Sequence, residues 1–128
     1  MVDEEVSMAI SELETGGEEG LLALKDTSVI GFQIGSFYRN NVDKFRPKGS
    51  FEFAMSYVHP NYRREGIGLA LKRALIADLT MRGGVESIIG CIYERNQASI
   101  KLHQGLGFRK VGDYRDGAKK YLVVRKSL

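Results

Sequence analysis

Residues 61–68 of this 128-residue chain combine two features that suit an anionic ligand: bare backbone and positive charge. They read NYRREGIG, so Arg63 and Arg64 precede Gly66 and Gly68, and an apolar helical pattern follows at once. The start of a helix presents unpaired N–H groups and the positive end of the helix dipole, where phosphate binds readily. We therefore predict a cradle for a phosphate or a pyrophosphate. The alternative is a glycine-rich helix start selected for packing alone.

Two common phosphate-binding motifs do not account for this stretch. The spacing differs from the P-loop, G-x-x-x-x-G-K-[ST], and from the dinucleotide fingerprint, G-x-G-x-x-G. The net charge is +3 and the pI about 9.0, which is mildly basic. Because no Lys/Arg run or basic stripe interleaved with aromatic residues is present, a nucleic-acid partner is not favoured.

The elements that must position this loop follow from the hydrophobic periodicity. Residues 51–58 alternate as a strand, residues 66–82 have the 3.6-residue period of a helix, and residues 85–93 are apolar on both faces, typical of a central strand. Asn96 can N-cap a helix over 97–105. The remaining expected elements are a helix over 3–14 ended by Gly16-Gly17, and strands over 20–26, 29–38, 108–114 and 120–125.

This order predicts an α/β (α+β sandwich) fold. We expect a mixed, splayed, mainly antiparallel sheet of about six strands with helices on both faces, forming a single domain over residues 1–128. Cys91 is the only cysteine, so neither an internal disulfide nor a Cys-based zinc site is expected, and we place Cys91 in the core. His59 and His103 lack the spacing of metal ligands, so no metal is expected.

The chain contains no apolar run near the roughly 20 residues that a membrane span needs, and no signal peptide is recognised. A single cysteine in such a chain favours a reducing compartment, so we expect the cytoplasm.

Two blocks of the sequence resemble the GNAT superfamily of acyl-CoA N-acyltransferases. Residues 63–68, RREGIG, fit its [Q/R]-x-x-G-x-[G/A] signature, and residues 96–108, NQASIKLHQGLGF, resemble its N-x-x-[AS]-x-x-L-[YH]-x-x-x-G-F block. The amino-acid sequence of the second block is most similar to the branch of phosphinothricin and amino-acid acetyltransferases. The resemblance implies acetyl-CoA as co-substrate and an amine as acceptor. Family members usually carry more elements before the hairpin at 20–38, which implies a shortened front, with either an open acceptor site or a homodimer that completes it.

The resemblance also implies which residues bind coenzyme A. The backbone of Tyr57 and Val58 would pair with the pantetheine arm, and Asn96 and Ser99 would lie along the cofactor. The pyrophosphate would be held by the loop, whose expected cofactor-binding residues are Arg63, Arg64, Glu65, Gly66, Ile67, Gly68 and Leu69.

Three residues are candidates for catalysis. Glu52 aligns with a glutamate that some family members use as a base, and Glu94 at the end of the next strand is its rival. For each, the alternative is a solvated strand carboxylate. His103 occupies the position where many members have a tyrosine that acts as a general acid, and His103 could donate a proton to the thiolate. Its alternative is a partly buried histidine that packs the helix.

Three hypotheses for function remain open from the sequence. The first is an acetyl-CoA-dependent N-acetyltransferase of a primary amine, on a small molecule or a protein. The second is a catalytically weak acyl-CoA sensor or interaction module, and the third a basic nucleic-acid-binding domain. The cations of the loop over 39–50 could favour an acceptor with a carboxylate, or could simply be solvated: Arg39, Lys44, Arg46 and Lys48.

Overall fold

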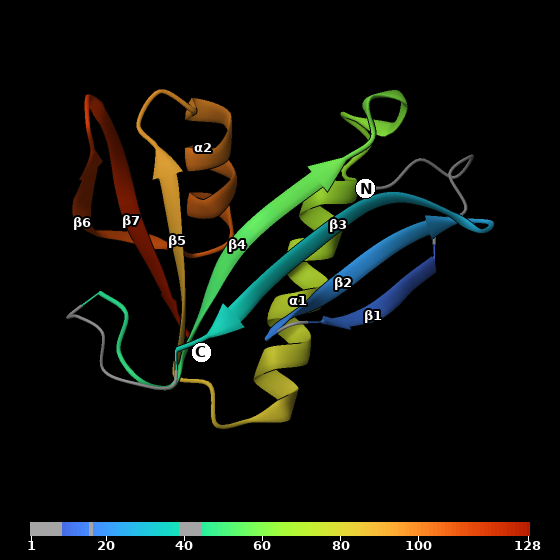
Figure 1. The fold of residues 1–128 in the computed structure, drawn as a ribbon, viewed down its shortest axis with the longest axis horizontal. Coiled ribbons are helices and arrows are strands. Elements are labelled where there is room, and N and C mark those ends of the chain that lie inside the picture. The colour runs from blue at the N-terminus through green and yellow to red at the C-terminus, as the bar shows by residue number, and fades with distance from the viewer. Residues whose placement is uncertain (1–8, 16, 39–44) are drawn as a thin grey trace. The chain divides into compact units, whose positions relative to one another are not determined.

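The computed structural model describes residues 9–15, 17–38 and 45–128, and it contains a mixed sheet of seven strands with two α-helices (Figure 1). The strand order is β1-β2-β3-β4-β5-β7-β6. The pair β4–β5 is parallel, and the pairs β1–β2, β2–β3, β5–β7 and β6–β7 are antiparallel. The elements are β1 (Ala9–Thr15), β2 (Glu18–Lys25), β3 (Ser28–Phe37), β4 (Ser50–Val58), the 3₁₀ turn η1 (Pro60–Tyr62), α1 (Ile67–Arg82), β5 (Ser87–Tyr93), α2 (Gln97–Gly105), β6 (Arg109–Asp116) and β7 (Lys119–Ser127).

The expected helix over 3–14 is wrong for its second half. Residues 3–8 lie outside the described residues, and residues 9–15 form β1, which pairs with β2 from Ala9↔Leu24 to Thr15↔Glu18. Gly16-Gly17 is as good a signal for a two-residue hairpin as for a helix end, and Gly17 has φ 85°. The ladder to β2 therefore overrides the helical spacing of the apolar residues, and it accounts for a seventh strand where about six were expected.

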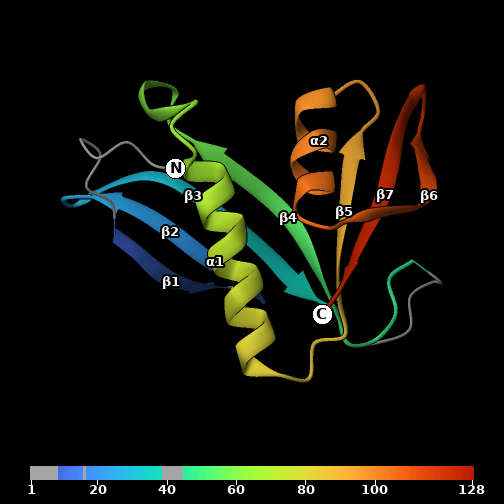
Figure 2. The same ribbon diagram turned by 180° about the vertical axis from the view of Figure 1, so that it is seen from behind.

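Contacts divide the chain into two compact units, of which the first comprises Met1–Ser36 and Ala54–Gly83. Here α1 covers one face of β2 and β3, as both ribbon views show (Figures 1 and 2). A Cβ on Gly31 of β3 would stand 3.5 Å from the side chains of Ile67 and Leu71, so the helix lies close against this strand. The buried apolar residues of this unit are Leu21, Ala23, Ile30, Ile67, Leu71, Leu75 and Leu79.

The second unit comprises Phe37–Phe53 and Gly84–Leu128. Aromatic rings join its elements: Phe51 contacts Phe37 at 4.9 Å between ring centroids, and Phe53 contacts Phe108 at 5.8 Å. His103 of α2 packs against Phe108 at 5.1 Å and approaches Gly90 of β5. The buried apolar residues are Phe51, Phe53, Ile88, Ile89, Ile92, Phe108, Val123 and Val124.

The pairing of β4 with β5 is short. It extends only from Ser50↔Ser87 to Phe53↔Gly90, so neither the end of β4 nor the end of β5 continues this ladder. On the side of β4 that faces away from β3, Ala54 to Val58 thus have no partner strand among the described residues. Neither α1 nor α2, the helices of the described segments, is long and apolar enough to cross a membrane.

Candidate functional site

The predicted phosphate loop connects β4 to α1, entirely within the first unit. Its entry is fixed by the backbone, because the N–H of His59 donates to the carbonyl of Ile30 at 2.7 Å and the N–H of Tyr62 donates to the carbonyl of His59 at 2.8 Å. The chain then passes through two left-handed residues, Arg64 with φ 66° and Gly66 with φ 81°. Such alternation turns successive N–H groups toward a common point and forms concavities that bind anions.

The backbone donors of this loop have no acceptors among the described residues. Within the described part of the chain, no N–H group of residues 64–69 donates a hydrogen bond, and the first such bond of the helix runs from Ala70 to the carbonyl of Gly66. Gly66 is the N-cap and supplies no side-chain cap. Six consecutive N–H groups at the positive end of a 16-residue helix therefore remain for an external acceptor.

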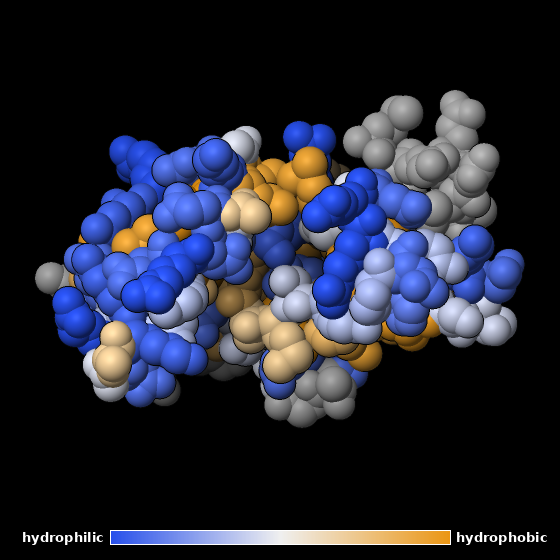
Figure 3. Space-filling view, turned by 90° about the horizontal axis from the view of Figure 1, so that it is seen from above, coloured by the Kyte–Doolittle hydropathy of each residue, from blue (hydrophilic) through white to orange (hydrophobic). Residues whose placement is uncertain are grey.

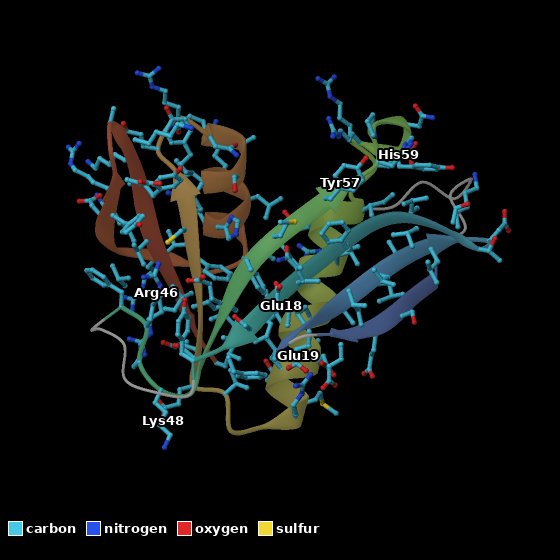
Figure 4. All side chains as sticks on the ribbon, in the orientation of Figure 1. Glu18, Glu19, Arg46, Lys48, Tyr57 and His59 are labelled. Carbon is cyan, nitrogen blue, oxygen red and sulfur yellow. The ribbon has the colours of Figure 1, made fainter. Side chains whose placement is uncertain are left out.

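The side chains around the loop add positive charge. Arg63 and Arg64 are exposed, and Arg63 Nε donates to the carbonyl of Val58 at 3.0 Å, which ties the loop to the end of β4. Figure 3 shows hydrophilic residues over this end of the first unit, and Figure 4 shows Tyr57 and His59 beside the loop. One oxygen of Glu65 is buried without a hydrogen-bond partner among the described residues. The two arginines outweigh this single carboxylate, so the local charge favours an anion.

The end of β4 presents its backbone outward. The N–H of His59 bonds toward β3, and backbone groups alternate along a strand, so the N–H and carbonyl of Val58 point away from β3. Tyr57 is 41% exposed, and its ring stacks on that of Phe32 at 5.8 Å. The N–H of Val58 thus faces outward beyond the β4–β5 ladder, while its carbonyl is held by Arg63 Nε at 3.0 Å. An outward N–H at a strand edge can pair with an extended ligand.

In the second unit, Asn96 and Ser99 have a clear local role. Asn96 is the N-cap of α2, as predicted, and its Oδ1 accepts the N–H of Ser99 at 3.1 Å. Asn96 is itself exposed. His103 Nδ1 lies 2.7 Å from the carbonyl oxygen of Ser99, which requires a proton on Nδ1. The His103 side chain is 6% exposed and contacts the rings of Phe53 and Phe108. These contacts fit the alternative raised from the sequence, a histidine that packs the helix.

Glu52 belongs to a cluster that the sequence does not reveal. Its Oε2 accepts a hydrogen bond from the hydroxyl of Tyr38 at 2.7 Å. The same oxygen forms an ion pair with Nε of Arg46 at 3.0 Å. Arg46 also donates to Cys91 Sγ at 3.4 Å. The guanidinium carbon lies 6.0 Å from the ring centre of Tyr38 and 5.9 Å from that of Tyr114. We refer to Tyr38, Glu52, Cys91 and Tyr114 as the cation box.

The cation box shifts the pKa values of two of the side chains in and around it. Burial, and then the hydrogen bond to Glu52, raise the pKa of Tyr38 well above its ordinary value, so Tyr38 stays a neutral donor. Burial opposes the charge of Arg46, but the hydrogen bond and the Coulombic attraction to Glu52 outweigh it and raise the pKa of Arg46. Tyr38 therefore donates as a neutral hydroxyl, and Arg46 keeps its positive charge.

One expectation about this region is wrong. Cys91 is exposed rather than in the core, although its neighbours Gly90 and Ile92 in β5 are buried. Of the loop cations, Arg46 is ion-paired and Lys48 is exposed, whereas Arg39 and Lys44 lie outside the described residues. Among the residues described, the Glu94 side chain forms no ion pair; its backbone carbonyl accepts a hydrogen bond from the Gln97 side chain at 3.1 Å. Among the described residues, no three His, Cys, Asp or Glu side chains are grouped so that they could hold a metal ion.

Comparison with known proteins decides the family. The model of the acetyltransferase (GNAT) family matches residues 3–108, which include the loop, the edge of β4 and α2. The chain belongs to the GNAT family. The resemblance of the two sequence blocks and the expected fold class are both confirmed by this match and by the folds of solved relatives.

The relatives of this GNAT chain are acyltransferases. The L-amino acid N-acyltransferase MnaT of Escherichia coli is 42% identical over 52 residues, a segment that makes up 41% of this chain and 30% of the relative. Ribosomal-protein-S18-alanine N-acetyltransferase from Escherichia coli has the same fold, with a TM-score of 0.79 at 20% identity and 94% of each chain covered. A Bacillus subtilis acetyltransferase in complex with CoA has a TM-score of 0.76 at 13% identity, covering 95% of this chain and 99% of that one.

Proposed function

We propose that this GNAT protein transfers an acetyl group from acetyl-CoA to a primary amine. The observation that carries the proposal is the run of six unbonded N–H groups at the start of α1, flanked by Arg63 and Arg64. A pyrophosphate needs such donors, and the family match supports coenzyme A as the molecule that carries it. The thioester supplies an activated acetyl group. In the reaction the amine nitrogen forms a bond to the carbonyl carbon, the carbon–sulfur bond breaks, the amine loses a proton and the thiolate gains one.

Several residues would hold the co-substrate. The N–H groups of residues 64–69 would bind the pyrophosphate, with Gly66 and Gly68 leaving room for its oxygens. The outward-facing peptide of Val58, with its neighbour Tyr57, would pair with the pantetheine arm, and the Val58 N–H is a candidate donor to the thioester oxygen. The sequence resemblance assigns Asn96 and Ser99 to the same ligand.

Glu52 is the proposed base. Its carboxylate is partly buried, with 22% of the side chain exposed, and the hydroxyl of Tyr38 orients it. Glu94 remains the rival base, and His103 remains a candidate acid. The contacts of His103 give the acid role less support than the base role of Glu52 receives, because His103 Nδ1 is engaged and the ring is packed between Phe53 and Phe108.

One observation favours a second candidate function. The carboxylate of Glu52 is ion-paired with Arg46 at 3.0 Å, so Glu52 can approach an amine only after Arg46 has moved away. A protein in which this pair never opens would bind acyl-CoA without turnover, as a sensor or an interaction module. Release of free thiol in the presence of an amine separates the two functions.

The test is a calorimetric titration of acetyl-CoA into the protein and into Gly66→Glu. A side chain at φ 81° is strained by about 1 kcal/mol and the new carboxylate repels phosphate, so we expect binding to weaken by about 100-fold or more. Gly83→Glu is the matched control, because Gly83 has φ 74° at the opposite end of α1 with no heavy atom within 4 Å of a Cβ. Equal binding by both variants, or none by the parent protein, would remove the proposal.

A further inference from the structure

The guanidinium of Arg46 occupies a place built for a cation. The Glu52 carboxylate binds it at 3.0 Å, the Cys91 sulfur accepts one of its N–H groups, and the rings of Tyr38 and Tyr114 lie near 6 Å from it. Aromatic rings attract cations through their negative faces, and the attraction grows when water is excluded. The side chains of Arg46 and Glu52 are only 23% and 22% exposed. Every wall of the cation box therefore favours positive charge.

The residues of the cation box lie on or beside strands, whereas Arg46 lies on a connection between strands, and all of them belong to the second unit. Glu52, Cys91 and Tyr114 are on β4, β5 and β6, and Tyr38 directly follows β3. Arg46 lies on the connection between β3 and β4, outside any regular element (Figure 4). The sheet thus fixes the box, while Arg46 reaches Glu52 and Cys91 from outside the sheet through its side chain.

A second contact seats this connection. The ring of Phe45 lies over Gly112 of β6, where an added Cβ would stand 2.3 Å from the Phe45 ring. Because Gly112 has no side chain, Phe45 can rest on the sheet and bring Arg46 to Glu52. The contacts of Arg46 with Glu52 and Cys91 are non-covalent and do not belong to a backbone ladder, so a competing cation can replace Arg46.

The box extends into a row of aromatic rings. Tyr114, Tyr121 and Tyr93 are directly opposite one another on β6, β7 and β5, with ring centroids 6.0 Å and 5.7 Å apart. Tyr114 is 46% exposed. An amine bound beside Glu52 would find a flat, electron-rich surface for the rest of its chain.

Arg46 is poorly placed to anchor a carboxylate of the acceptor. Recognition of a carboxylate by both oxygens uses two nitrogens on one edge of the guanidinium. Here Nε is engaged by Glu52 and one terminal nitrogen by Cys91. A carboxylate brought to this place would also approach the charge of Glu52.

We propose that the acceptor is an amine without a carboxylate, whose ammonium group displaces Arg46 from the cation box, and that Arg46 closes the box when no acceptor is bound. The proposal rests on the N-acetyltransferase function proposed above. The displaced state leaves Glu52 next to the ammonium, the group from which a proton must be removed. Arg46 thereby acts as an internal competitor of the acceptor.

The experiment compares agmatine with arginine, two amines that differ by one carboxylate. Thiol release from acetyl-CoA is measured for the parent protein, Arg46→Gln and Lys48→Gln, a control on the same connection with an exposed side chain. If Arg46 closes the box about 90% of the time, its removal tightens agmatine about tenfold. We expect agmatine to be preferred by the parent protein, its KM to fall in Arg46→Gln, and no change in Lys48→Gln.

Two results would overturn the proposal. A preference for arginine that is lost in Arg46→Gln would make Arg46 the anchor of a carboxylate. Loss of turnover of both amines in Arg46→Gln, with unchanged acetyl-CoA binding and thermal midpoint, would make Arg46 a required positioning residue.

Agmatine binding without turnover provides a readout independent of catalysis. Tyrosine ring signals in NMR spectra should shift on agmatine addition at lower concentration in Arg46→Gln than in the parent protein. Gly112→Ala, which retains Arg46 but displaces Phe45, should behave like Arg46→Gln if seating of the connection matters. Unshifted tyrosine signals in Arg46→Gln would end the proposal, whereas absent acetyl-CoA binding would end only the proposed function.

Discussion

The phosphate loop and the cation box are built in opposite ways. The loop is one continuous stretch, residues 61–69, and its function resides in backbone N–H groups that point outward because a helix begins there. The box takes its members from positions 38, 52, 91 and 114, on or beside four strands, and its function resides in side chains. The proposed phosphate binding thus depends on neighbouring residues in the chain, whereas the proposed selection of a cation depends on the sheet.

The difference teaches where each part is vulnerable. A local anion site depends on few residues and tolerates changes elsewhere, since helix geometry alone orients its donors. A dispersed cluster loses its geometry whenever one supporting strand or its register shifts. We therefore expect mutations of the box to change the chemistry while the loop still binds acetyl-CoA.

The largest effect that would sharpen this contrast is expected from Glu52→Gln. Glutamine can still accept from Tyr38 and Arg46 but cannot take a proton at neutral pH. We expect kcat/KM for an amine acceptor to fall by about 10²- to 10⁴-fold, the usual contribution of a general base. Calorimetry should show acetyl-CoA binding close to that of the parent protein.

Glu94→Gln is the control for this change, since Glu94 is the rival carboxylate in the same unit. It should retain turnover within about threefold, as solvated surface positions generally do. A large loss in Glu94→Gln with normal activity of Glu52→Gln would exchange the two roles.

A second, intermediate effect concerns the support beneath the phosphate loop. Lys72 of α1 is 7% exposed and donates to Gln33 of β3 at 2.5 Å. Burial lowers the pKa of Lys72 from 10.5 to about 8. The folded protein therefore binds fewer protons than the unfolded chain between pH 8 and 10.5, so this residue makes stability rise with pH over that window.

The measurement is urea unfolding of the parent protein and Lys72→Met between pH 7.5 and 10.5. The free energy of unfolding of the parent should gain about 2 to 3 kcal/mol over this window relative to the variant, whose residue 72 does not titrate. Below pH 8 the penalty is constant, because both states are protonated. Parallel pH profiles for the two proteins would contradict the depressed pKa of Lys72.

The smallest effect is expected at Asn96, where a structural and a proposed binding role coincide. Asn96→Ala should cost about 1 kcal/mol of stability, because the N–H of Ser99 loses its acceptor. Asn96→Asp keeps the cap and should restore stability, but it lacks the side-chain NH₂ group. If that group contacts the pantetheine, both variants weaken acetyl-CoA binding in calorimetry; if only Asn96→Ala does, Asn96 serves the helix alone.

Much of the fold was predictable because its signals are local. The strand over 51–58, the helix over 66–82 and the capped helix over 97–105 agree with β4, α1 and α2 to within one residue at each end. The failure at residues 9–15 has a physical cause: a short amphipathic segment bounded by Gly-Gly suits either a helix or a hairpin, and only the partner strand β2 decides. The exposed position of Cys91 was missed for a similar reason, since a single sequence does not show which face of a strand is covered.

The sequence by itself indicated the family and predicted the phosphate loop, because the donors, glycines and arginines of that loop are neighbours along the chain. It also supplied Glu52 as a candidate base through the family resemblance. Only the tertiary structure brought Arg46 to Glu52 and placed both between Tyr38 and Tyr114, residues 76 positions apart in the chain (114 − 38). Contacts between strands depend on sheet order and register, which arise from the packing of the whole sheet and leave no spacing in the sequence from which they can be read.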